Sequence, residues 1–143
     1  MTAPTHGAVF SHVSVGANEM SKAMRFYDAV LAPLGMARKA THRVAIGYGP
    51  KDFEGLNPPF WVLKPYDKSA ASPGNGVTVA FTVPTRTAVD AFHAAALAAG
   101  GTDQGAPGIR EHYHPDYYGA YVRDLEGNKI CAVCHLPQSD AFD

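Results

Sequence analysis

The stretch HVSV at residues 12–15 and the stretch TVAF at residues 78–81 occupy equivalent places in two halves of the chain, 66 positions apart. Each stretch leads into an amphipathic segment that stops at a glycine, Gly35 in the first half and Gly101 in the second. One strand–helix unit cannot bury its apolar face alone, so two copies in one chain are expected to share a core. The repeat therefore predicts two related modules.

Apolar periodicity predicts the elements of each module. Alternation favours strands over about residues 8–15 and 77–83, and apolar stripes of helical spacing follow over 20–34 and 85–99. Asn18 is expected to cap the first helix, because its side chain can accept from a free helical N–H. Further short strands are expected near residues 36–40, 43–48, 60–64, 117–123 and 128–135. The helices would cover one face of the sheet, which leaves the other face free to line a cavity.

Length and charge limit the classes of function. The chain has 143 residues, which suits one domain with a core of its own. Its net charge is −1, with both signs dispersed, so no electrostatic footprint for nucleic acid or an anionic membrane is present. Residues 1–8 contain no apolar signal region, and no stretch approaches transmembrane length. We expect a cytoplasmic protein without nucleic-acid or membrane partners.

The two cysteines, Cys131 and Cys134, form one CxxC spacing near the C-terminus. That spacing is typical of zinc and redox sites in cytosolic proteins. Here it falls within an expected strand, where residues three apart point to opposite faces. We therefore expect neither a shared metal nor a disulfide between these two sulfurs.

Polar and aromatic residues concentrate in the segment REHYHPDYY at residues 110–118. In an extended segment His112 and His114 would face the same side, as a general base or a ligand pair requires. The alternative is a solvated, aromatic-rich loop that packs over the second module. Trp61 could provide an apolar wall for a ring-bearing ligand, although such residues also serve as core.

Taken together, these segments resemble the vicinal oxygen chelate superfamily, which includes glyoxalase I, bleomycin-resistance proteins and extradiol dioxygenases. The resemblance extends from Phe10 to His135 and is carried by SHVSV (11–15), RFY (25–27), PLGM (33–36), VAF (79–81), AVDAFH (88–93), AGG (99–101) and YVRDLEGNK (121–129). It implies an α+β fold of two βαβββ modules, about residues 8–65 and 77–136 with a linker at 66–76, forming an incomplete barrel around a central cavity. It also implies a homodimer.

Members of this superfamily that catalyse reactions hold one divalent metal, with a His from the first strand of each module and a Glu from the final strand. His12 matches the first position, but Thr78 stands at the second and Cys131 at the third. A thiolate and an imidazole could still bind iron, nickel, manganese or zinc, with His112, His114 or His135 completing the site. Of these, His135 falls on the same strand face as Cys131. The alternative is an eroded site, in which Cys131 is a small buried hydrophobe.

Three functions remain open at this point. The first is a metal-dependent lyase, isomerase or dioxygenase that acts on a small molecule with adjacent oxygens, with His112 or His114 as acid or base. The second is a metal-free protein that sequesters a small molecule, and the third is a scaffold domain. In either of the first two, the residues expected to touch the ligand are Thr78, Trp61, Tyr121 and His135.

Overall fold

The computed structural model describes residues 7–138, and over that range the chain forms two α-helices and two four-stranded sheets. The helices are α1 (Met20–Leu31) and α2 (Arg86–Ala98), and a short 3₁₀ helix, η1 (Ala32–Leu34), follows α1. The strands are β1 (Val13–Gly16), β2 (Met36–Thr41), β3 (Ala45–Pro50), β4 (Phe60–Leu63), β5 (Val79–Thr82), β6 (Thr102–Ile109), β7 (Tyr118–Arg123) and β8 (Lys129–Cys134).

The two sheets have the same topology. Their strand orders are β1-β4-β3-β2 and β5-β8-β7-β6, with β1–β4 and β5–β8 parallel and the other pairs antiparallel. The elements β1, α1 and β2 each begin 66 residues before β5, α2 and β6. The chain is therefore built from two β-α-β-β-β modules, as the repeat predicts, and the sheets of the described region do not close into a barrel.

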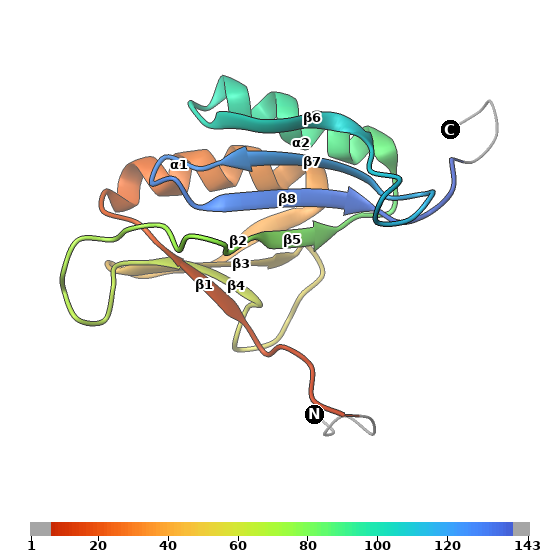
Figure 1. Cartoon of the computed structure of the whole chain (residues 1–143). Coiled ribbons are helices and arrows are strands. Elements are labelled where there is room, and N and C mark those ends of the chain that lie inside the picture. The colour runs from red at the N-terminus through yellow and green to blue at the C-terminus, as the bar shows by residue number, and fades with distance from the viewer. Residues whose placement is uncertain (1–6, 139–143) are drawn as a thin grey trace.

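Both modules contribute to one hydrophobic core. The helices α1 and α2 lie side by side on the same side of the sheets (Figure 1). Phe26 and Val30 of α1, Phe92 of α2 and Val122 of β7 belong to one buried cluster. Full burial of each such side chain contributes about 1.5–3 kcal/mol, so the shared core explains why neither module is expected to fold alone.

The helix starts differ in how they are capped. At α2, Thr85 Oγ1 accepts from the Ala88 backbone N–H at 3.1 Å. At α1 the prediction of Asn18 as the cap is wrong, because Glu19 occupies that position without a side-chain cap. The Asn18 side chain instead donates to Glu126 at 2.8 Å and accepts from the backbone N–H of Ala71 at 2.7 Å. It therefore ties the linker to the turn between β7 and β8.

Two strands depart from the sequence expectation. β1 begins at Val13 rather than near Ala8, and the preceding Phe10 is 91 % exposed. The apolar pattern gave no strand at β6, although the βαβββ modules implied by the resemblance include one here, because its sequence TDQGAPGI contains Pro107 and glycines that disfavour strands. Its pairing with β7 is irregular around Gly105. No helix of residues 7–138 has the length and apolar character needed to cross a membrane.

Candidate functional site

The face of the second sheet that lies opposite the helices carries a cavity of about 450 Å³, which we call the second-module pocket. Cross-strand pairing builds its floor, because Cys131 of β8 lies between Ala80 of β5 and Tyr121 of β7. The segment before β7 adds further walls. The lining residues are Thr78, Ala80, Tyr113, His114, Tyr117, Tyr121, Lys129 and His135.

Two phenols cover the cysteine of this floor. The hydroxyl oxygens of Tyr117 and Tyr121 lie 2.7 Å apart, and Tyr121 is the cross-strand neighbour of Cys131, whose side chain is fully buried. Burial is the main cause that raises the pKa of the Cys131 thiol and of both phenols. All three groups are therefore protonated near neutral pH. A protonated thiol is a weak hydrogen-bonding group.

Two histidines form a directed hydrogen-bond chain at the rim. His114 Nδ1 accepts from the backbone N–H of Asp116 at 3.1 Å, so a neutral His114 carries its proton on Nε2. That nitrogen lies 2.8 Å from His135 Nδ1 and donates to it. In this neutral arrangement His135 keeps its proton on Nε2, which leaves that N–H available to a ligand.

The charge of the second-module pocket is positive. Lys129 Nζ lies 5.2 Å from the centroid of the Tyr121 ring, and the Arg110 guanidinium carbon lies 5.4 Å from the same centroid. No Asp or Glu of residues 7–138 belongs to the lining. The pocket thus offers phenol, imidazole and ammonium donors around aromatic rings.

His12 lies in a smaller cavity of about 200 Å³ between β1, β4 and β5. Its Nδ1 is 2.9 Å from Ser11 Oγ and 3.2 Å from Asn57 Nδ2. Ala80 lines both this cavity and the second-module pocket, so the two adjoin. His12 and Cys131 nevertheless do not share a cavity lining.

The structure places the remaining predicted residues apart from one another. Of the two alternatives for the segment that contains His112 and His114, the structure has the loop, because residues 111–113 form a turn. His112 is exposed, packs against the Tyr113 ring at 4.2 Å, and does not line the pocket that His114 reaches. Trp61 belongs to the first sheet, where its ring covers Gly47 and stacks on the ring of His42, with the two ring centroids 6.3 Å apart. Of the predicted site residues, the structure brings four together in the lining of the second-module pocket: Thr78, His114, Tyr121 and His135.

Sequence reasoning missed Tyr113, Tyr117 and Lys129 as lining residues. A signal existed for Tyr117, because residues 117 and 121 are four apart along an expected strand and so share a face. The position of Tyr113 depends on the turn at 111–113, and the proximity of Lys129 to the Tyr121 ring depends on the β7–β8 register. Neither feature is encoded locally.

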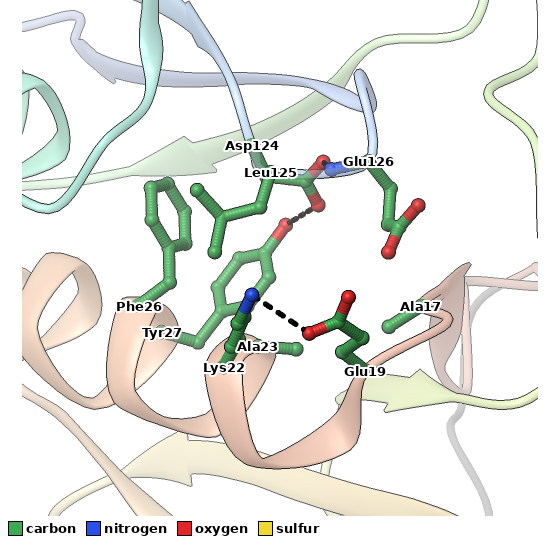
Figure 2. Close-up of a pocket in the computed structure, with 9 residues that line it drawn as sticks. All are labelled: Ala17, Glu19, Lys22, Ala23, Phe26, Tyr27, Asp124, Leu125 and Glu126. Atoms are coloured by element: carbon green, nitrogen blue, oxygen red, sulfur yellow. Dashed lines mark hydrogen bonds and ion pairs between the residues drawn. The ribbon is translucent and has the colours of Figure 1, made fainter.

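A further small cavity of about 230 Å³ lies where α1 meets the β7–β8 turn. Figure 2 shows the Tyr27 side chain pointing toward Asp124, to which its hydroxyl donates at 2.5 Å. Asp124 also accepts from the backbone and side chain of Asn128, each at 2.9 Å, and Lys22 pairs with Glu19 at 2.9 Å. Because these polar groups already form hydrogen bonds and an ion pair with one another, we interpret this cavity as a structural junction between the modules.

The donor set that residues 7–138 present does not fit a metal of the kind the superfamily uses. Among the described residues, no three or more His, Cys, Asp or Glu side chains come together as a possible metal site. Cys131 is a buried, protonated thiol at the position where a carboxylate is expected, and Thr78 offers only a hydroxyl.

Comparison with known proteins identifies the relatives of this fold. The sequence model of the glyoxalase/bleomycin resistance protein/dioxygenase superfamily matches residues 9–132. The chain belongs to this superfamily. No curated protein gives a significant match to the chain.

Solved structures of the superfamily superpose on the chain. A glyoxalase/bleomycin resistance protein from Albidiferax ferrireducens T118 is 37% identical, with a TM-score of 0.78 over 87% of this chain and 98% of that one. A glyoxalase/bleomycin resistance protein/dioxygenase family enzyme from Burkholderia phytofirmans PsJN is 22% identical, with a TM-score of 0.66 over 90% and 100%. The fosfomycin resistance protein FosX from Mesorhizobium loti is 12% identical, with a TM-score of 0.61 over 90% and 93%. The last two show the fold alone.

Proposed function

We propose that this superfamily member binds a small planar molecule in its second-module pocket without a metal ion. The observation that carries this proposal is the substitution of the expected carboxylate by Cys131 under two hydrogen-bonded phenols. Such a floor presents hydrogen-bond donors where a metal-dependent relative would present a ligand. The pocket therefore suits a molecule that brings its own acceptor oxygens.

The lining defines the class of ligand. One hydroxyl of the Tyr117–Tyr121 pair donates to the other, and the remaining O–H can donate to a ligand oxygen. His135 offers its Nε2–H, and Lys129 offers a positive charge without a competing carboxylate in the lining. Tyr113 and Tyr117, with centroids 4.8 Å apart, supply ring faces. The best match is an aromatic or conjugated anion with hydroxyl or carbonyl oxygens.

In this proposal His114 is a positioning residue, because it orients His135 rather than reaching the ligand as an acid or base. The protein acts by sequestration, the activity suggested by the bleomycin-resistance relatives, and needs no chemical step. The homodimer and the cytoplasmic location expected from the sequence are part of the same proposal. A partner subunit would extend the open face of the sheet without replacing the lining residues named above.

The experiment is a titration of ¹⁵N-labelled protein with 3,4-dihydroxybenzoate in the presence of EDTA, followed by amide chemical shifts. We expect saturable shifts centred on residues 78–80, 113–121 and 129–135. The variant Tyr121→Phe should bind about tenfold more weakly, because loss of one hydrogen bond to an anionic ligand costs about 1.4 kcal/mol. Tyr118→Phe, whose hydroxyl donates to Asp90 outside this pocket, is the matched control. Unchanged shifts in this region would contradict the proposal.

A further inference from the structure

A second cavity lies where the chain leaves β4, and its volume of about 680 Å³ exceeds that of the second-module pocket. We call it the linker pocket, because residues 65–70 of the long β4–β5 connection form one wall. Figure 1 shows this connection as the yellow-green loop at the left, beside the ends of β3 and β4. The lining residues are Ala17, Asn18, Arg43, Val44, Ala45, Leu63, Lys64, Pro65, Tyr66, Lys68, Ser69 and Ala70.

Three cations and no carboxylate belong to this lining, which contains Arg43, Lys64 and Lys68. Two carboxylates contact residues of the lining without belonging to it. Asp67 accepts from the backbone N–H of Ser69 at 2.9 Å, and Glu126 accepts from the Asn18 side chain at 2.8 Å. The chain as a whole carries a net charge of −1, so this concentration of positive charge is local. It favours an anionic occupant.

The rest of the lining is apolar and open. Tyr66 is fully exposed at 101 %, and Val44 is 50 % exposed, although both are large hydrophobic side chains. Leu63 and Pro65 are half-buried beside them. An anion with an apolar portion would cover this surface while its charged group pairs with the cations.

The backbone conformation at Lys68 is unusual for a lysine. Among the described residues, Lys68 is the one non-glycine with a positive φ, at 67°. A lysine is disfavoured there relative to glycine, because its Cβ crowds the backbone. Glycine would adopt this conformation at lower cost, yet the residue at this position of the lining is a cation.

We propose that the linker pocket binds an organic phosphate monoester, a dianion whose apolar group packs on Val44, Leu63 and Tyr66. Phosphate suits this pocket because guanidinium and ammonium groups are its usual partners and because three positive charges match two negative ones. The site is separate from the second-module pocket, and this proposal does not depend on the proposed function.

The test is a titration of ¹⁵N-labelled protein with 1-naphthyl phosphate, with 1-naphthol as the neutral analogue and inorganic phosphate as the analogue without an apolar group. We expect 1-naphthyl phosphate to shift residues 17–18, 43–45 and 63–70, and to bind at least tenfold more tightly than either analogue. Equal affinity for 1-naphthol would overturn the role of the cations. Equal affinity for inorganic phosphate would overturn the role of the apolar wall.

A pair of triple variants with the same change in net charge separates local from general electrostatics. Arg43→Gln/Lys64→Gln/Lys68→Gln should weaken binding of 1-naphthyl phosphate at least tenfold. The control Arg25→Gln/Lys39→Gln/Lys51→Gln, whose positions are exposed and outside the linker pocket, should bind as the wild type does. Equal losses in both variants would overturn the proposal.

The two proposed sites fail independently. Tyr121→Phe should leave the affinity for 1-naphthyl phosphate unchanged, and the linker-pocket triple variant should leave the affinity for 3,4-dihydroxybenzoate unchanged. Shifts from 1-naphthyl phosphate that map to Tyr121 and Lys129 instead of residues 63–70 would reject the linker pocket while leaving the proposed function intact.

Discussion

The hydroxyl oxygens of Tyr117 and Tyr121 lie 2.7 Å apart, and Tyr121 pairs across the strands with the buried Cys131, so the floor of the second-module pocket is a hydrogen-bonded pair of phenols beside a buried thiol. The cluster occupies the place where a metal-dependent member of the superfamily is expected to carry a carboxylate ligand. Hydrogen-bond donors thus stand where a metal-dependent relative would have a negatively charged ligand. The predictions below concern this site and the contacts that hold the two modules together.

The thiols should be unreactive in the folded protein. Cys131 is 0 % exposed and Cys134 is 2 % exposed, and burial raises the pKa of the Cys131 thiol. With 5,5′-dithiobis(2-nitrobenzoate) near neutral pH, we expect less than about one tenth of the thiol to react in native buffer over the time in which both cysteines react fully in urea. Rapid labelling of Cys131 in the native protein, located by mass spectrometry, would mean that the thiol is accessible and ionised.

Binding to the second-module pocket should depend on Lys129. The variant Lys129→Gln removes the only Lys or Arg of the pocket lining, so the affinity for 3,4-dihydroxybenzoate should fall about threefold to tenfold. The loss should shrink as salt is added, because screening weakens a partly exposed charge pair. Lys51→Gln, an exposed lysine outside the pocket, serves as the control, and calorimetric titration measures both. Equal affinities of the two variants for 3,4-dihydroxybenzoate would show that Lys129 does not contribute to binding.

The junction between the modules should contribute strongly to stability. The Tyr27 hydroxyl donates to Asp124, and burial, followed by interaction with Asp124, raises the pKa of this phenol well above its ordinary value. Tyr27→Phe should lower the free energy of unfolding by about 2 kcal/mol, because a buried carboxylate loses one donor. Urea unfolding measures the change, with the fully exposed Tyr66→Phe as the control. Equal stabilities of the two variants would show that the bond contributes nothing net.

The contact between α2 and β6 should appear in an acid titration. The hydrogen bond from His93, at 3.0 Å, is the main cause that lowers the pKa of Asp103, followed by the Gly105 backbone N–H at 2.9 Å. A folded pKa below the unfolded one stabilises the protein above the unfolded value, and this stabilisation is lost as pH falls through the folded pKa.

The variant His93→Ala should therefore raise the Asp103 pKa toward its ordinary value, as followed by the ¹³C shift of its carboxyl carbon. His42→Ala, which changes a histidine stacked on Trp61 in the other module, should leave the Asp103 pKa unchanged. An Asp103 titration that is the same in both variants would assign the low pKa to the backbone alone.

Much of the fold could be predicted from local sequence. The stops at Gly35 and at Gly100, the first glycine of the Gly100–Gly101 pair, and the hairpin around Gly127 follow from a residue type that favours positive φ. The strand β6 was missed because Pro107 and its glycines hide the alternation, although the 66-residue repeat from β2 pointed to it. A repeat preserves topology after the local signal has weakened.

The candidate site was less predictable, because its composition depends on register and on a turn. The adjacency of Tyr121 to Cys131 is a cross-strand relationship that no spacing along the chain reveals. His114 reaches His135 because residues 111–113 turn, and the same turn directs His112 away from the pocket. Sequence could therefore supply the candidates Thr78, His114 and His135 without showing which of them would meet.

The most direct test of the central claim compares ligand affinity with and without metal. Metal content of the purified protein is measured by elemental mass spectrometry, and 3,4-dihydroxybenzoate is titrated calorimetrically in EDTA and again after incubation with iron(II), nickel, manganese or zinc. We expect binding in EDTA, and the same affinity, within about threefold, in every metal condition. Binding that requires a metal, with about one metal per chain that disappears in His12→Ala, would contradict it.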